Sequence, residues 1–231
     1  MDFFGNKFFL LAITFGFYFL SKLVQKKTGW ILLNPILLAI ALLICFLQCT
    51  GVSYDTYAEA GSLVEFWLKP AVVALGVPLY LQLRMIKKQL LPIIASQIAG
   101  CIVGLVSVTV IAKLMGATPE VVMSLAPKSV TTPIAMEVSS AVGGIPSLTA
   151  AVVIVVGLFG AICGFKVLQV GRIGSPIAQG LSMGTASHAV GTSRAMEVSG
   201  KYGAYASLGL TLNGILTALL SPAILHLLGL Y

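Results

Sequence analysis

The chain alternates long apolar runs with short polar segments, and the length of each run predicts its structure. The apolar runs occupy residues 6–24, 30–49, 70–85, 89–114, 147–168 and 204–228. A helix needs about 20 predominantly apolar residues to cross a bilayer, so the pattern predicts about six transmembrane helices, of which the third is short. Residues 52–67 differ, because acidic and aromatic residues alternate there. That mixture predicts an amphipathic helix at the membrane interface.

Two polar stretches rich in helix-breaking residues separate the later runs. Residues 118–145 contain Pro127 and Pro133, with only about ten residues on either side of that pair. Ten helical residues are about 15 Å long, roughly half the thickness of the bilayer core. This length predicts a re-entrant hairpin with its tip near the midplane, although a fully crossing broken helix is the alternative. Residues 174–202 repeat the pattern, with a tip region at 185–194.

An internal repeat relates the two polar stretches. The pentapeptide AMEVS occurs at 135–139 and again at 195–199, an offset of 60 residues. The same offset pairs Gly100 with Gly160, Gly104 with Gly164, Met123 with Met183 and Thr132 with Thr192. The duplication therefore runs from about residue 90 to about residue 203. Duplicated hydrophobic units with interruptions are typical of secondary transporters.

Composition narrows the class of protein. The 231 residues are 58% hydrophobic and only 9% charged, with a mean hydropathy of +1.02. A soluble surface needs more charge than this, so the chain is predicted to be a polytopic all-α membrane protein in contact with the lipid bilayer. The net charge of +7 lies in short clusters between apolar runs and does not indicate nucleic-acid binding. The four cysteines lack metal-site spacing, so no metal or cofactor is expected.

The basic clusters also predict orientation. Most lysines and arginines fall on one side of the predicted topology, which places both termini outside the cytoplasm by the positive-inside rule. The first run is followed by Ser21-Lys22 rather than a signal-peptide cleavage site, so it is expected to be retained. One span separates the two hairpins. If both are re-entrant, they enter from opposite sides and form an inverted repeat, with an elevator-like transporter architecture. If both cross fully, the repeats are parallel.

Two regions follow from this topology. Residues 1–88 are predicted to form scaffold and oligomerisation helices, in a homodimer. Residues 89–231 are predicted to form a transport domain, with repeats at 89–145 and 147–203 and a final helix at 204–228.

The hairpin tips carry the candidate binding residues. Irregular backbone at membrane depth must line a cavity or be buried in protein, and helix N-termini favour anions. Arg194 adds a bidentate partner for a carboxylate. The predicted ligand is therefore a small hydroxylated or oxo-carboxylate anion. The predicted substrate-binding residues are Lys128, Ser129, Thr131, Thr132, His188, Thr192, Ser193 and Arg194.

Two acidic residues have two open interpretations. Glu137 and Glu197 occupy equivalent places in the repeat. Each is interpreted either as a proton carrier, because burial raises the pKa of a carboxyl group, or as a cap in the first turn of its helix. His188 is a further proton candidate, since its ordinary pKa lies near neutrality, or else a structural residue.

The run APKSVTTPIAME at 126–137, with SHAVGTSRA at 187–195, resembles the LrgB/CidB family over nearly the whole chain. The resemblance implies residence in the bacterial inner membrane and a separate LrgA/CidA-type membrane partner. It also implies two competing functions. Bacterial relatives are antiholin-like modulators of murein hydrolase export and lysis, whereas a plant relative is a plastid glycolate/glycerate translocator.

Two functional hypotheses follow. The first is a secondary transporter for small monocarboxylates such as glycolate, glycerate, pyruvate or lactate, proton-coupled and working by alternating access. The second is an antiholin-like regulator that acts with its LrgA/CidA-type partner. An enzyme is not expected, because no nucleophile elbow surrounds a serine and the adjacent Ser187 and His188 would rarely face one another.

Overall fold

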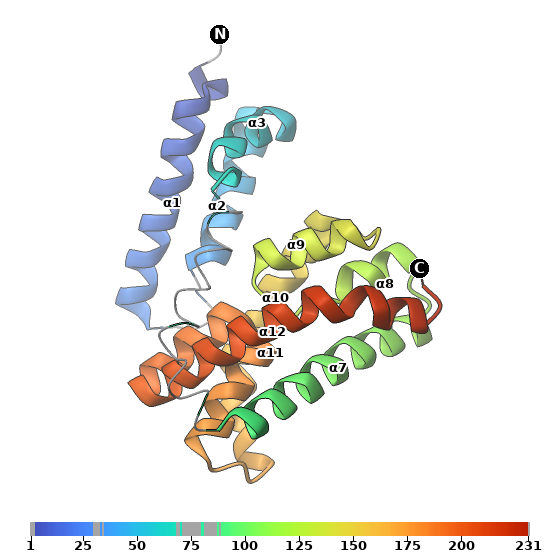
Figure 1. Cartoon of the computed structure of the whole chain (residues 1–231). Coiled ribbons are helices and arrows are strands. Elements are labelled where there is room, and N and C mark those ends of the chain that lie inside the picture. The colour runs from blue at the N-terminus through green and yellow to red at the C-terminus, as the bar shows by residue number, and fades with distance from the viewer. Residues whose placement is uncertain are drawn as a thin grey trace. The chain divides into compact units, whose positions relative to one another are not determined.

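The described part of the chain is helical. The computed structural model describes residues 3–29, 33, 35–67, 70, 80, 87 and 89–230, and within these ranges it contains helices and no strand. The α-helices are α1 (Lys7–Thr28), α2 (Pro35–Thr50), α3 (Tyr54–Glu65), α7 (Leu90–Leu114), α8 (Pro119–Leu125), α9 (Thr132–Ala141), α10 (Pro146–Val170), α11 (Pro176–Val198) and α12 (Gly200–Leu227) (Figure 1).

The chain divides into two compact units, Met1–Ala71 and Val72–Tyr231. In the first unit, α1 packs against α2 and α3. The Lys7 ammonium lies 2.6 Å from a Glu59 carboxylate oxygen, and the hydroxyls of Thr14 and Tyr57 are 3.1 Å apart. Helix α3 confirms a helix within the predicted amphipathic segment. The predicted functional boundary at residue 88 remains a prediction.

Four of the six predicted spans are confirmed as helices long and apolar enough to cross a membrane, namely α1, α7, α10 and α12. Helix α2 begins at Pro35 rather than residue 30 and has 16 residues, fewer than the about 20 that a perpendicular span needs. The predicted span at 70–85 lies outside the continuously described residues.

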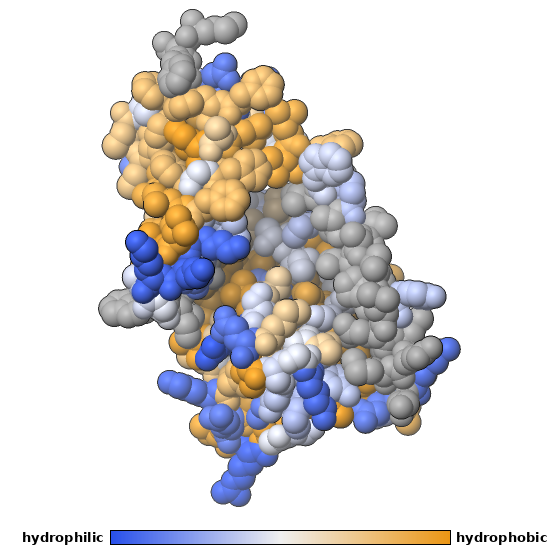
Figure 2. Space-filling model, turned by 90° about the vertical axis from the view of Figure 1, so that its left-hand side faces the viewer, coloured by the Kyte–Doolittle hydropathy of each residue, from blue (hydrophilic) through white to orange (hydrophobic). Residues whose placement is uncertain are grey.

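Many large apolar side chains are exposed on the surface, while several polar side chains are buried inside. Phe8 is 77% exposed on α1 and Phe159 is 67% exposed on α10, whereas Gln97 and Asn213 are each only 2% exposed. Figure 2 shows apolar side chains gathered over one face of the first unit, in the upper part of the view. Exposed apolar side chains are unfavourable in water but not in the hydrocarbon core of a bilayer. The chain is therefore an integral membrane protein.

The first predicted polar stretch forms two short helices joined by a break, and the choice between a re-entrant hairpin and a crossing broken helix remains a prediction. We call residues 119–141 hairpin 1; it consists of α8, a non-helical tip at 126–131 and α9. Hairpin 1 is tied to α10, because the Thr149 hydroxyl lies 2.9 Å from the carbonyl oxygen of Ser124, near the end of α8, and 2.7 Å from the Ser139 hydroxyl of α9. Pro133 near the start of α9 fits the first turn of a helix, where its missing N–H costs nothing.

Helix α11 contains the second hairpin, which we call hairpin 2 (residues 176–198). The helical dihedral angles fail at Ser187 and His188. A Cβ atom built on Gly191 would lie 2.7 Å from the Met183 carbonyl oxygen, whereas eight residues of continuous helix span about 12 Å. The chain therefore reverses, with a first arm at 176–186 and a second arm at 189–198.

The reversal of hairpin 2 involves only residues 187–188, so the predicted tip region of 185–194 was too long. Thr192, Ser193 and Arg194 lie in the second arm. The physical reason is that polar residues can remain helical when their hydroxyls bond back to the helix. The Thr192 hydroxyl donates to the His188 carbonyl at 2.8 Å.

Directions of packing show how the repeated units are related. Ile93 of α7 belongs to one apolar cluster with Leu181, and Gln97, one turn later, bonds Thr185, so α7 runs parallel to the first arm of hairpin 2. On α10, Gly157 faces His188 whereas Gly164 faces Met183, so α10 runs antiparallel to the same arm. Helices α7 and α10, each of 25 residues and each followed by a hairpin, therefore point in opposite directions. This arrangement favours the inverted repeat over the parallel one.

Candidate functional site

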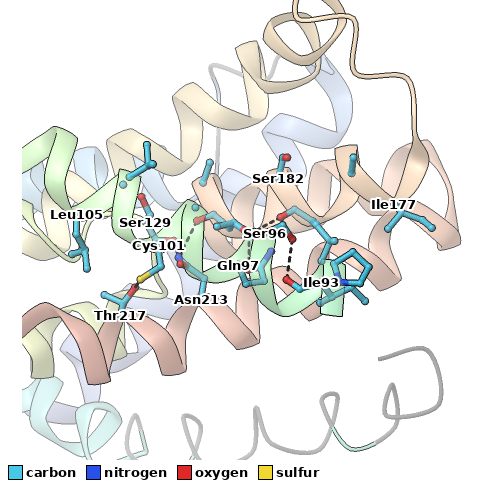
Figure 3. Close-up of a pocket in the computed structure, with 18 of the residues that line it drawn as sticks. Ile93, Ser96, Gln97, Cys101, Leu105, Ser129, Ile177, Ser182, Asn213 and Thr217 are labelled. Atoms are coloured by element: carbon cyan, nitrogen blue, oxygen red, sulfur yellow. Dashed lines mark hydrogen bonds between the residues drawn. The ribbon is translucent and has the colours of Figure 1, made fainter. Parts of the chain in front are cut away.

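A cavity of about 670 Å³ lies in the second unit. It is bounded by α7, the first arm of hairpin 2, α12 and the tip of hairpin 1 (Figure 3). Apolar residues including Ile93, Leu105 and Ile177 form much of its wall. The polar residues that line it are Gln89, Ser96, Gln97, Lys128, Ser129, Ser175, Ser182, Thr185, Asn213 and Thr217.

A chain of hydrogen bonds crosses the cavity wall and joins both hairpins. The Thr185 hydroxyl lies 2.8 Å from the Gln97 side-chain oxygen. The Asn213 amide nitrogen donates to the Thr185 carbonyl at 3.0 Å and to the Ser129 carbonyl at 3.4 Å. Thr185 precedes the break in α11, where helix carbonyls lose their regular partners. Asn213 therefore supplies a donor to hairpin 2 and also holds the tip of hairpin 1 (Figure 3).

Lys128 is the only charged residue among the described residues that line the cavity. Its ammonium group donates to the Ser129 hydroxyl at 3.2 Å, which is a neutral partner. A half-buried ammonium group is stabilised by an opposite charge, and the described lining contains no carboxylate. The cavity is therefore electrostatically suited to an anion at the tip of hairpin 1.

The sequence prediction did not include Gln97 and Asn213. Both are almost fully buried, and each lies in a predicted membrane span where a polar side chain is costly unless it has a role. An isolated polar residue within an apolar run was the sequence signal that could have identified each of them. Sequence reasoning concentrated on the polar segments between the runs and therefore missed both residues.

The tip of hairpin 2 packs against α10, and its His188 side chain does not line the cavity. The His188 Nε2 atom lies 2.8 Å from the Val153 carbonyl oxygen, and the ring faces Gly157. His188 has φ of 42°, a region that non-glycine residues occupy rarely and at a cost of about 1–3 kcal/mol. Tertiary contacts with α10 therefore hold this reversal.

The remaining predicted tip residues are dispersed. Thr131 precedes α9 as its N-cap, and its buried hydroxyl has no hydrogen-bond partner among the described residues. Thr132 begins α9. Thr192 is buried in the second arm of hairpin 2, and Ser193 is exposed there. Of the eight predicted binding residues, the structure brings only Lys128 and Ser129 to the cavity.

Arg194 lies away from the cavity lining and has a partner within its own helix. Its guanidinium group lies 2.6 Å from a Glu197 carboxylate oxygen, and the two side chains are 40% and 64% exposed. Such an exposed pair contributes little to stability in water. It does show that Arg194 is already paired with a carboxylate.

The interpretation of Glu137 and Glu197 as caps in the first turns of their helices is wrong. Glu137 is the sixth residue of α9, beyond the first turn. Glu197 lies in the last turn of α11, the end of a helix that disfavours a negative charge. The second error follows from the misplaced tip, because a reversal at 187–188 puts the helix start well before Glu197.

These observations define a class of protein: a polytopic all-helical membrane protein in which two broken helical segments border a largely apolar cavity that carries polar side chains. The family model of the LrgB-like family matches residues 14–227. The chain therefore belongs to the LrgB-like family.

Similarity to individual relatives also extends over nearly the full length. The holin-like protein CidB of Staphylococcus epidermidis is 37% identical over 219 residues, which cover 94% of this chain and 95% of the relative. The holin-like protein CidB of Staphylococcus aureus is 35% identical over 218 residues, with the same coverages. An uncharacterized protein of Haemophilus influenzae is 38% identical over 214 residues, covering 93% of this chain and 92% of the relative. No solved structure matches the chain.

Proposed function

We propose that this chain is a secondary transporter of small monocarboxylates, such as glycolate, glycerate, pyruvate or lactate, in the bacterial inner membrane. The observation that carries the proposal is the cavity between the hairpins, where Lys128 is the only charged residue of the described lining. A single ammonium group suits a monovalent carboxylate. The hydroxyl of Ser129 and the amides of Gln97 and Asn213 lie on the same lining and suit a hydroxyl or keto oxygen of the substrate.

The inverted repeat supports alternating access as the mechanism. Inverted repeats with broken helices commonly place the substrate between the two units, which then rock or slide around it. In the proposal, residues 89–231 move against a scaffold formed by residues 1–88, in a homodimer with both termini in the periplasm. Coupling to protons is proposed, with uptake driven by an inward proton gradient.

The relatives' names favour a second function, that of a holin-like regulator. Two relatives that cover nearly the whole chain are called holin-like protein CidB. In this proposal the chain acts with an LrgA/CidA-type partner to control permeability or lysis, and the cavity residues serve packing. This function agrees better with the names, whereas transport agrees better with a single ammonium group in a cavity whose described lining has no carboxylate.

Uptake into proteoliposomes distinguishes the two functions. The purified protein is reconstituted, and accumulation of radiolabelled glycolate and pyruvate is measured with and without an inward proton gradient. Transport predicts saturable uptake that Lys128→Met lowers at least tenfold, because the anion loses its charged partner. Lys166→Met is the matched control, since Lys166 is exposed on α10 and does not line the cavity.

Arg194→Ala distinguishes the proposed binding site at Lys128 from the site at Arg194 that the sequence predicted. Because Arg194 pairs with Glu197 outside the cavity lining, uptake should stay within about twofold of wild type. If folded protein takes up neither acid, alone or with the LrgA/CidA-type partner, the transport proposal fails. Release of a trapped dye that needs the partner would then support the regulator.

A further inference from the structure

The two repeats share residues but pack them differently. In the second repeat, hairpin 2 lies tightly against α10. A Cβ atom on Gly157 would lie 2.5 Å from the His188 ring, and one on Gly164 would lie 2.5 Å from the Met183 sulfur. Ser187 crowds Gly160 in the same way. These three glycines allow hairpin 2 to close on α10.

In the first repeat, hairpin 1 does not cover the equivalent surface of α7. Gly104 corresponds to Gly164 and Met123 to Met183, yet a Cβ atom on Gly104 would meet nothing within 4 Å. At Gly100 the nearest atom is the Thr185 methyl at 3.3 Å, which belongs to hairpin 2 rather than hairpin 1. Gly100 and Gly104 instead line the cavity.

Hairpin 1 packs at present on the neighbouring face of α7. Met123 and Ala126 belong to one apolar cluster with Cys101 and Leu105. Successive residues on a helix are about 100° apart, so the face of Gly100 and Gly104 lies one residue step around α7 from the face that hairpin 1 now contacts. The change that would make the first repeat resemble the second is therefore a rotation of hairpin 1 by about 100° around α7.

We propose that hairpin 1 docks on the Gly100–Gly104 face of α7 in a second state of the protein, as hairpin 2 docks on the Gly160–Gly164 face of α10 in this one. The two hairpins alternate, so that one is closed while the other is open. Docking of hairpin 1 fills part of the cavity. By repeat equivalence it brings Lys128, the counterpart of His188, against Gln97, the counterpart of Gly157. This inference rests on the proposed transport function, for which it supplies the gate.

The size of the cavity supports a contraction of this kind. About 670 Å³ is in the range of cavities that hold drug-sized ligands, and it is far larger than a two- or three-carbon acid. In the open state a small anion would therefore keep much of its water. Closure of hairpin 1 removes that excess volume next to Lys128, where the anion is proposed to bind.

Paired cysteines test the docking directly. In a background with the four native cysteines replaced by serine, Gly164→Cys with Met183→Cys reports the approach of hairpin 2 to α10 in this state, where the end of the Met183 side chain meets Gly164. Gly104→Cys with Met123→Cys reports the proposed one, and a disulfide needs the two Cβ atoms within about 4.5 Å. Cross-linking under mild oxidation is measured with and without glycolate.

We expect the 164–183 pair to cross-link rapidly in resting protein. The 104–123 pair should cross-link at least fivefold more slowly at rest and faster with glycolate, and either disulfide should block uptake until it is reduced. Failure of the 104–123 pair to cross-link, or equal resting rates for the two pairs, would overturn the inference. Cross-linking does not depend on uptake, so absence of uptake in the cysteine-free background counts against the transport proposal alone.

A steric variant gives a second measurement. In Gly104→Phe the new side chain enters space that is open in this state, so the protein should fold with an unchanged thermal midpoint. The phenyl ring should block the Gly100–Gly104 face of α7. Uptake should fall at least tenfold, whereas Gly16→Phe, on α1 and also facing open space, should retain it. Normal uptake by folded Gly104→Phe would contradict docking on this face.

Discussion

Asn213 offers the sharpest test of how the two hairpins are held together. Its amide nitrogen is the donor for the Thr185 carbonyl at 3.0 Å and for the Ser129 carbonyl at 3.4 Å. Replacement by leucine keeps the number and branching of the side-chain heavy atoms and removes both bonds. A buried carbonyl left without a donor costs about 1–3 kcal/mol, and the longer bond to Ser129 adds little. We therefore expect a loss of about 2 kcal/mol in the free energy of unfolding.

The assay is thermal unfolding of the detergent-solubilised protein, followed by circular dichroism. For a chain of this size 1 kcal/mol corresponds to about 2–4 °C, so Asn213→Leu should lower the midpoint by about 4–8 °C. Asn213→Asp should lower it further, because an ionised carboxylate would face two carbonyl oxygens. Ser221→Ala is the control, since its buried hydroxyl bonds only a carbonyl of its own helix. Equal shifts for Asn213→Leu and Ser221→Ala would refute the reasoning.

Other predictions concern packing in the second unit, and all are checked by the same thermal assay. Gly184→Ala should destabilise by about 1–3 kcal/mol or more, because its Cβ would lie 2.8 Å from the backbone nitrogen of Leu210 on α12. Gly104→Ala should instead stabilise by about 0.4–1 kcal/mol, since it meets nothing within 4 Å; a loss of stability there would contradict the open face. Thr149→Val should cost about 1–3 kcal/mol, because the Thr149 hydroxyl ties α10 to Ser124, and an unchanged midpoint would show that the tie is unimportant.

The helices and the first hairpin were predictable because their signals are local. An apolar run of sufficient length predicts a membrane helix from composition alone. Pro127 and Pro133 disfavour a continuous helix across residues 127–133, so the tip of hairpin 1 fell where expected. The reversal of hairpin 2 has no such signal, because neither Ser187 nor His188 is a helix breaker. It depends on the contacts of His188 with α10, which only the folded chain provides.

The error in the site follows from the error in that reversal. A tip extending to residue 194 made Arg194 a natural anion partner, whereas a reversal at 187–188 places it in the second turn of the second arm. Lys128 was predicted because the prolines located its tip correctly. Gln97 and Asn213 come from helices far apart in sequence, and only the packing of α7 and α12 around hairpin 2 shows that they share one cavity.

The differences between the repeats, rather than their identities, determine which hairpin is closed. Gly100, Gly104 and Met123 have identical counterparts in the second repeat, so these residues allow either packing. The repeats differ where hairpin and helix would meet most closely: Gly157 receives the His188 ring, but Gln97 would receive the Lys128 ammonium group. Closing hairpin 1 without a ligand would press a positive charge into a site with only neutral polar partners, which is costly. An anion bound at Lys128 supplies the opposite charge. It therefore stabilises the closed state of hairpin 1, where the ammonium group is buried, more than the open state, where water already solvates it. Since a ligand shifts an equilibrium only by its differential affinity for the two states, this pair of residues is where substrate binding would drive the exchange of the hairpins.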